Sequence, residues 1–526
     1  MKVFFMRMDT MADLYFNGTI YTMTGENETQ EAVLVEDNKV KRTGSYEELK
    51  EQADHFIDLQ EKTMMPALTD VHQHLIMIGK KLASLALDDV TDIDLMKEKV
   101  ASFDSGHQWN NILGYDENNF DNQYKIKIDE LDQLTSKPTL ITRICSHAGV
   151  VNSEAFKRAG IADDVKDPEG GYFERDEEGK LTGWVYDKAF EMMRAATVDD
   201  TVESISKDIT RAVKYMQSLG IANVHTEDLA YYGDFNVPLD AYLSTLGEDG
   251  LKFRVNLLTH EQVYDDVVKA NKTYKPNYVE RDAMKIFADG AFGAKTALVS
   301  EPYEHTDQHG LQIHSKEKLE AMVKNARSND DAIAVHMIGD QAIEMVLDAI
   351  EKYPVAKGKH DRLIHISLLR PDLIERMSKL PVVCDVQPTF LTSDMPWVEE
   401  YIGSNRAKYL YPFKTLLDKG LILGGSSDAP IEKVNPFLGI HALITRQDGG
   451  TVYNPNEVVE RFEAFKMYTS EAAKIVYRED VQGQIKEGYF ADFIVLDRDV
   501  MKVEANELKE TKVLKTIIDG ETVFEM

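Results

Sequence analysis

Eight short apolar, β-rich runs recur along the chain and constrain its fold more than any other feature. They lie at residues 64–74, 220–226, 253–259, 284–290, 332–340, 362–367, 382–388 and 421–428. Most are separated by helix-like segments such as SKEKLEAMVKNARS at 315–328. Parallel strands need crossover connections of this kind. Because eight such units close a barrel, we predict an α/β fold with a TIM-like (β/α)8 barrel over residues 65–479.

The gap between the first and second runs does not fit this spacing. It holds roughly 140 residues, far more than an ordinary βα connection. We therefore predict a large insertion after strand 1, over about residues 80–215, as a candidate cap for the site. Within it, residues 170–187 have the pattern of a hairpin turning at Glu178-Gly179, and residues 189–197 and 204–220 have helical patterns.

The two ends of the chain have a different, shorter β pattern. Residues 12–23 are strand-like around Asn17-Gly18, which is a strong hairpin signal. Short β-rich runs separated by polar or glycine turns recur near the C-terminus, at 492–499, 513–520 and 521–526. We predict that residues 12–64 and 480–526 form one small β-sandwich domain.

Charge and composition exclude several classes of partner. The formal net charge of -31 argues against nucleic acid and against anionic membranes, which both need a basic surface. The only two cysteines, Cys145 and Cys384, are far apart and indicate neither a disulfide framework nor a cysteine zinc site. Because the cysteines indicate no disulfides, we expect a cytoplasmic protein, in a reducing compartment. The first eleven residues are too short and too broken by charge for a secretory signal.

Residue types that bind metals gather at the C-terminal ends of the runs, where barrel enzymes build their active sites. A His-x-His pair on an extended strand points both rings to one face. Such a pair alone is weak evidence, but further candidates lie on other strands and the whole set could hold two ions. Neutral imidazoles and carboxylates suit Zn, Mn, Fe or Ni. The candidates are His72, His74, Lys285, His336, His365 and Asp428.

Several longer motifs carry a family resemblance across nearly the whole chain. They are residues 65–75, 284–298, 335–343, 387–390, 426–431, 467–473 and 483–497. In order and spacing they resemble the amidohydrolase superfamily, and within it the branch of N-substituted formamide deformylases and their YtcJ-like relatives, amidohydrolase family 3. Two departures stand out. Ala67 replaces a usual glycine, and LIHISLL lacks the usual acidic residue before His365, which puts the support of that imidazole in question.

The resemblance implies a binuclear metal centre. His72, His74 and Asp428 would hold one divalent ion, and His336 and His365 the second, with zinc the first expectation for both. Carboxylated Lys285 would bridge them. An ammonium has no lone pair, but reaction with carbon dioxide gives an anionic carbamate with two ligand oxygens.

The resemblance also implies a reaction. Metal-activated hydroxide would attack the carbonyl of an amide or formamide-like small molecule and so cleave its C–N bond, which is not a peptide bond. Asp428 would take up the proton of the attacking water and pass it to the leaving nitrogen. His147 and Asp289 are candidate substrate-binding residues, although an Asp-Gly pair after a strand is more often simply a turn.

Two other functions remain open from the sequence. A related barrel could deaminate a cyclic substrate, but mononuclear deaminases of this superfamily place a glutamate soon after the strand-five histidine, and Asp340 is the nearest acidic residue after His336. A metal-binding regulatory protein without catalysis is the second alternative, against which the intact ligand set weighs. A homodimer is the usual default for a soluble enzyme.

Overall fold

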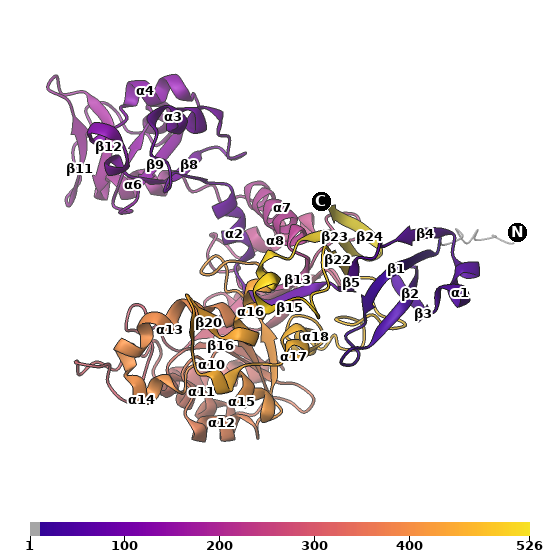
Figure 1. Ribbon diagram of the computed structural model, residues 1–526. Coiled ribbons are helices and arrows are strands. Elements are labelled where there is room, and N and C mark those ends of the chain that lie inside the picture. The colour runs from indigo at the N-terminus through magenta and orange to yellow at the C-terminus, as the bar shows by residue number, and fades with distance from the viewer. Residues whose placement is uncertain (1–10) are drawn as a thin grey trace, which may run out of the picture. The chain divides into compact units, whose positions relative to one another are not determined.

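The computed structural model describes residues 11–526, so the predicted absence of a secretory signal concerns a segment that lies mostly outside the described residues. The chain divides into two compact units (Figure 1). The larger unit comprises the chain up to Leu75 together with Val213–Met526, and the smaller one comprises Ile76–Ala212. The domain boundaries given above stay predictions. Among the described residues, no helix combines the length and the apolar composition needed to cross a bilayer.

Eight parallel strands form a nearly closed barrel in the larger unit. Every predicted run overlaps one of them, and consecutive strands along the chain are neighbours in the sheet. The ring closes where Asp428 N donates to His72 O at 2.8 Å and His74 N donates to Ala429 O at 2.8 Å. The predicted barrel is therefore confirmed. Its strands are β6 (Leu68–Gln73), β13 (Ile221–Thr226), β14 (Arg254–His260), β15 (Val279–Phe287), β16 (Ile333–Met337), β17 (Asp361–His365), β18 (Val382–Val386) and β19 (Ile422–Gly425).

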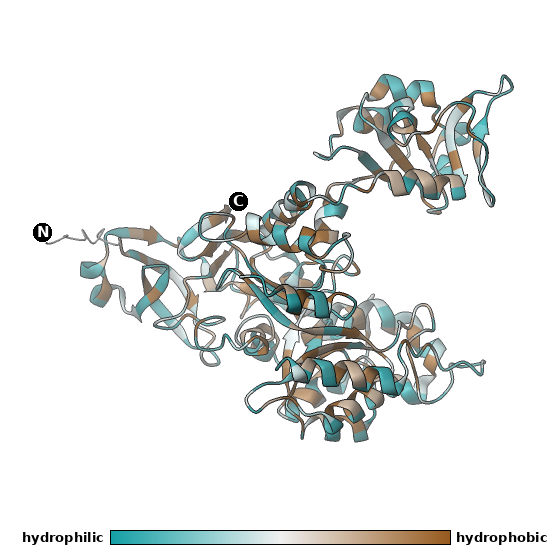
Figure 2. Ribbon diagram, turned by 180° about the vertical axis from the view of Figure 1, so that it is seen from behind, coloured by the Kyte–Doolittle hydropathy of each residue, from teal (hydrophilic) through white to brown (hydrophobic). Residues whose placement is uncertain are grey.

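Helices follow the barrel strands, most of them as crossover connections to the next strand, and α16, α17 and α18 follow the last strand, β19. The predicted helix at 315–328 is α10, capped by Ser315 and buried through Leu319, Val323 and Ala326 on one face. Figure 2 shows hydrophilic and hydrophobic residues together on these helices, as amphipathic packing requires. The helices are α7 (Val202–Ser218), α8 (Asn236–Thr245), α9 (Tyr264–Ala270), α10 (Lys316–Ser328), α11 (Asp340–Lys352), α12 (Pro371–Met377), α13 (Pro388–Ile402), α14 (Ser404–Ala407), α15 (Phe413–Asp418), α16 (Pro436–Thr445), α17 (Arg461–Lys466) and α18 (Ser470–Ile475).

Alternate residues of the barrel strands face the interior. One apolar cluster joins four neighbouring strands through Leu258, Ala283, Ala334 and Ile364. Side chains two residues further along a strand share its face, so the interior continues toward the C-terminal ends through residues such as Lys285. This alternation decides which side chains meet at the mouth of the barrel.

The two ends of the chain share one sheet, as predicted. Its hydrogen-bonded order is β24-β23-β22-β5-β1-β2-β3, with β4 beside β1. An apolar core joins strands from both ends, with Val33 and Phe493 in the same cluster. The strands are β1 (Asp13–Tyr21), β2 (Thr29–Glu36), β3 (Lys39–Gly44), β4 (His55–Asp58), β5 (Thr63–Pro66), β22 (Phe493–Leu496), β23 (Val513–Ile518) and β24 (Glu521–Glu525), and the short helix α1 (Tyr46–Leu49) follows β3.

The predicted hairpin at Asn17-Gly18 is wrong. Strand β1 runs straight through this pair, and its register with β2 shifts between Phe16 and Ile20. Asn17 has φ 58, a value that a bulge uses as readily as a tight turn. Its side-chain amide donates to Asp58 at 2.7 Å, so the pair forms a bulge inside one strand.

The smaller unit is built on a sheet in the order β11-β12-β10-β9-β8-β7. The predicted hairpin is β11 and β12, and Gly179 in its turn has φ 82. Trp109 and Tyr115 are both buried in its apolar cores. The strands are β7 (Leu85–Ala86), β8 (Asn110–Tyr115), β9 (Thr139–Arg143), β10 (Ala148–Val151), β11 (Gly171–Arg175) and β12 (Leu181–Asp187), with helices α3 (Ile93–Ser102), α4 (Ile128–Leu134), α5 (Ser153–Arg158) and α6 (Lys188–Ala196).

Candidate metal centre

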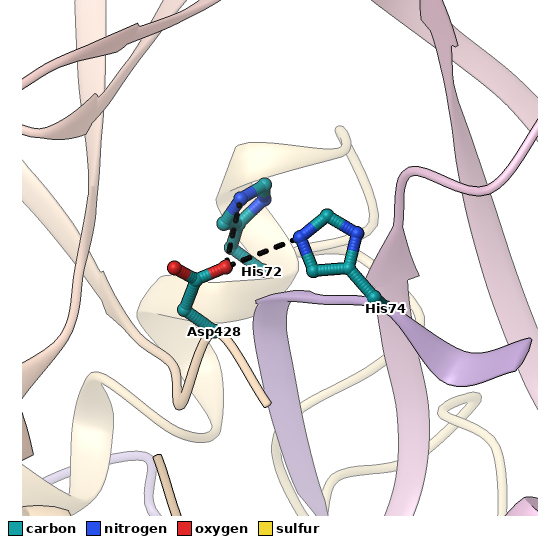
Figure 3. Close-up of side chains that lie close together, drawn as sticks. All are labelled: His72, His74 and Asp428. Atoms are coloured by element: carbon teal, nitrogen blue, oxygen red, sulfur yellow. Dashed lines mark ion pairs between the residues drawn. The ribbon is translucent and has the colours of Figure 1, made fainter. Parts of the chain in front are cut away.

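His72, His74 and Asp428 meet where β6 and β19 close the barrel. Oδ1 of Asp428 lies 3.5 Å from His72 Nε2 and 3.4 Å from His74 Nε2. Figure 3 shows both imidazoles directed at the same carboxylate. Their donor atoms all lie within 4.8 Å of one another. Two imidazoles, once neutral, and one carboxylate at this spacing form a donor set that fits a divalent transition-metal ion.

The other nitrogen of His74 fixes its ring. Nδ1 lies 3.0 Å from the carbonyl oxygen of Glu227, and since a carbonyl can only accept, Nδ1 carries a proton. Burial would lower the pKa of His74, but the adjacent carboxylate of Asp428 outweighs it and raises the pKa to about 9. A proton on Nε2 and a metal ion compete for one lone pair, so metal binding at His74 would release a proton.

Asp428 stays ionised although it is buried. Burial acts to raise its pKa, but the hydrogen bond from His74 and nearby positive charge lower the pKa below its usual value. Its backbone has φ 54, in the left-handed region. Nearby, Asp70 accepts from His72 N at 3.2 Å and from the hydroxyl of Ser427 at 2.5 Å, which ties the two strand ends together. Asp70 was not among the predicted site residues.

Lys285 is fully buried beside this cluster. Its Nζ lies 3.2 Å from His72 Nε2 and 4.7 Å from the centre of the Phe287 ring. Burial lowers the pKa of this amine to about 8. A substantial fraction is therefore neutral near physiological pH, and only the neutral amine is a nucleophile for carbon dioxide.

His336 and His365 lie together on the next two strands. Their ring centroids are 4.5 Å apart, and His365 is 5.7 Å from His72. His336 Nε2 lies 3.1 Å from the carbonyl oxygen of Gly290, which in a neutral ring leaves the lone pair on Nδ1. Burial lowers the pKa of His365 to about 4 and that of His336 well below its usual value. Both are neutral at pH 7, as metal ligands must be.

The support of His365 comes from a residue that the sequence analysis missed. Nδ1 of His365 lies 2.7 Å from Oε1 of Gln387, which follows β18. The Gln387 amide nitrogen donates to Ser426 Oγ at 2.9 Å and to Asp385 O at 3.2 Å, so its orientation is set. A glutamine thus takes the place of the acidic residue that LIHISLL lacks. Its position at a strand end, in the QPTF motif, was the available signal.

The two predicted substrate residues have different surroundings. His147 is exposed in the turn between β9 and β10 of the smaller unit. Asp289 is buried, and its carboxylate accepts backbone N–H bonds from Leu298 at 2.8 Å, Ile338 at 3.0 Å and Gly339 at 2.8 Å. Because these three hydrogen bonds occupy both carboxylate oxygens, they favour a role for Asp289 in positioning the loop after His336. The substrate contacts of both residues stay predictions.

Comparisons with known proteins agree with this architecture. The sequence profile of the amidohydrolase family matches residues 55–524. The chain belongs to the amidohydrolase family. This confirms the resemblance seen in the sequence and supports a metal-dependent hydrolase of the amidohydrolase type.

Individual relatives of this amidohydrolase cover nearly its whole length. It is 40% identical to the Bacillus subtilis (strain 168) protein named "Putative amidohydrolase YtcJ", over 98% of this chain and 100% of that one. It is 26% identical to N-substituted formamide deformylase of Arthrobacter pascens, over 98% of this chain and 99% of the relative. A crystal structure of an uncharacterized metal-dependent hydrolase from Pyrococcus furiosus has a TM-score of 0.77, at 29% identity, covering 93% of this chain and all of that one.

Proposed function

We propose that this amidohydrolase hydrolyses a C–N bond of amide or formamide type in a small molecule. The observation that carries the proposal is the shared carboxylate of Asp428, held between His72 and His74 with Lys285 next to them. The relative named N-substituted formamide deformylase supports this bond type. The metal-dependent hydrolase of similar structure supports metal dependence.

The residues divide naturally into two ligand groups. His72, His74 and Asp428 would hold one ion, His336 and His365 the other, and carboxylated Lys285 would join them, with zinc the expected metal. Bound divalent ions of this kind lower the pKa of a coordinated water toward neutrality and polarise a substrate carbonyl.

Asp428 is the proposed acid–base residue. It is ionised beside the two imidazoles, so its carboxylate can accept a proton from the attacking water. The same oxygen can then return that proton to the nitrogen that leaves. The backbone of Asp428 is held at this point, because its N–H donates to His72 O at 2.8 Å where the barrel closes.

Deamination is less well supported. The acidic residue after His336, Asp340, accepts from Ser300 N at 2.9 Å and from Arg370 at 2.9 Å. It lies in the first turn of α11, with its carboxylate already taken up by these partners. It is therefore not placed to exchange protons with a ring nitrogen.

The test combines metal analysis with a chromogenic substrate. We would count transition-metal ions per chain in gently purified protein, and then follow the release of 4-nitroaniline from 4-nitroformanilide, alongside a panel of N-alkylformamides and N-acyl amines. Asp428→Asn should lose at least about 1000-fold in kcat, whereas Asp176→Asn, in the exposed turn between β11 and β12, should not change it. Protein with about two ions that hydrolyses no member of the panel would refute the bond type, and protein that binds no ion after reconstitution with zinc and bicarbonate would refute the site.

A further inference from the structure

Three strand ends at the barrel mouth contribute side chains that are not proposed as metal ligands. They are Glu227 after β13, His260 at the end of β14, and Gln387 after β18. Gln387 is bonded to His365, and one oxygen of Glu227 accepts from the hydroxyl of Tyr231 at 2.5 Å. His260 is the remaining group, and a role for it in substrate binding rests on the proposed amide hydrolysis.

The side chain of His260 faces the barrel interior. Leu258, two residues earlier on β14, packs with Ala283 and Ala334 in the interior apolar cluster. Residues two apart on a strand share a face, so His260 continues this face at the mouth. Its register partner on β15 is Lys285, and only 5% of His260 is exposed.

A backbone hydrogen bond decides which nitrogen of His260 is protonated. The N–H of Gln262 donates to Nδ1 at 3.0 Å. A backbone N–H cannot accept, so Nδ1 supplies the lone pair and the neutral ring carries its proton on Nε2. His74 and His365 have the opposite arrangement, with Nδ1 donating to a carbonyl oxygen and to a side-chain oxygen respectively.

The Nε2–H of His260 has no acceptor among the residues that the structure describes. Two rings hold the imidazole in place. Tyr231 lies 5.8 Å away at 78°, and Phe287 lies 5.6 Å away at 38°. Nε2 is not among the fully buried polar atoms that lack a partner, so this donor, fixed in direction and without a protein acceptor, is accessible to a bound ligand that supplies the acceptor.

We propose that His260 binds the substrate, donating from Nε2–H to an oxygen of the bound amide. It is not a metal ligand, because Nε2 carries the proton and Nδ1 is bonded to Gln262. The β14 side of the mouth therefore selects substrates with an oxygen acceptor at this position, which deepens the proposed function by assigning a recognition residue to it.

The test distinguishes the contribution of the Nε2–H donor of His260 from the contribution of its ring. His260→Phe keeps a ring of similar size without the donor, and His260→Gln restores an N–H at comparable reach. In zinc-loaded protein, we expect His260→Phe to weaken the binding of acetohydroxamate, measured by calorimetry, by about ten-fold. We expect kcat/KM for 4-nitroformanilide to fall at least as much. His260→Gln should recover most of both, and the zinc content should equal that of wild type in both variants.

Two outcomes would overturn the inference. Binding and turnover that are unchanged in His260→Phe would show that Nε2–H contacts no ligand, and loss of zinc in this variant would show that His260 is a metal ligand. If His260→Phe does not fold, His260→Leu provides the comparison without the donor. If wild type hydrolyses no formanilide, the proposed reaction fails, while the acetohydroxamate affinities still decide the role of His260.

Discussion

Gln387 holds His365 through a hydrogen bond of 2.7 Å between the amide oxygen and Nδ1. The bond leaves the lone pair of the neutral ring on Nε2, the nitrogen available to a metal. Partners of this kind set the tautomer and the orientation of a ligating imidazole. The contact joins the ends of two neighbouring strands, β17 and β18, so the orientation of His365 depends on barrel pairing.

We therefore expect Gln387→Leu to weaken the binding of the second metal ion by about 10–100-fold. Equilibrium dialysis against zinc measures this directly. Gln387→Glu should bind nearly as well as wild type, because its carboxylate accepts the same hydrogen bond. Gln52→Leu, at an exposed position, is the matched control. Equal zinc affinity in Gln387→Leu and wild type would remove Gln387 from the metal centre.

Lys285 should form a carbamate more readily as the pH rises. Burial lowers the pKa of its amine to about 8, and only the neutral amine reacts with carbon dioxide. After incubation with 13C-labelled bicarbonate and then zinc, the 13C NMR carbamate signal should grow between about pH 7 and about pH 9. Lys285→Ala should show no signal, whereas Lys180→Ala, which removes an exposed lysine, should keep it. A pH-independent signal, or one that persists in Lys285→Ala, would contradict the assignment.

His72→Asn should remove metal without unfolding the barrel. His72 is buried and its Nε2 faces both Asp428 and Lys285, so an asparagine is too short to replace it at that point. We expect less than about half of the wild-type zinc per chain, activity below detection, and an unchanged far-UV circular dichroism spectrum. His55→Asn alters an exposed imidazole in the terminal sheet and should match wild type in all three measurements. Wild-type activity in His72→Asn would refute the proposed site.

The barrel could be predicted because its strands are buried on both faces. Such strands appear as nearly continuous apolar runs, and β6 is buried at every position. The ligand candidates could be predicted for a related reason, since they lie where these runs end. The contact between Gln387 and His365 could not, because it depends on how the turns after two different strands are directed.

The hairpin predicted at Asn17-Gly18 was wrong because the local sequence signal does not distinguish a hairpin from a bulge. The sequence signal for a two-residue hairpin is a residue that accepts positive φ, and a bulge needs the same property. Which of the two forms depends on distant pairing, here the parallel contact of β1 with β4 and β5.

The departure at Ala67 is mild for a complementary reason. Ala67 has no positive φ, so this position does not need a glycine.

Tyr231→Phe should destabilise the mouth of the barrel. The Tyr231 hydroxyl is the hydrogen-bond partner of one carboxylate oxygen of Glu227, whose other oxygen is buried without one among the described residues. Removal of the Tyr231 hydroxyl leaves the buried Glu227 carboxylate without a side-chain partner, which lowers the free energy of unfolding by about 1–3 kcal/mol. Urea unfolding of metal-free protein measures the change, with Tyr215→Phe, an exposed tyrosine, as the control. Tyr231→Phe combined with Glu227→Gln should lose less than the single change, and an additive loss would contradict this explanation.

Gly18 in the β1 bulge should tolerate no side chain, although its φ is not positive. A Cβ there would lie 2.5 Å from the carbonyl oxygen of Lys62 and 2.7 Å from Cβ of Leu59. Both are fixed atoms, so the strand must shift, and we expect Gly18→Ala to lower the free energy of unfolding by about 1–3 kcal/mol. Gly293→Ala is the matched control, because its Cβ would meet only the Trp397 ring at 3.9 Å. Thermal unfolding should show a lower Tm for Gly18→Ala alone. An unchanged Tm would mean that the bulge moves freely, and the close approach of β1 to the segment before β5 would then not hold the terminal sheet in register.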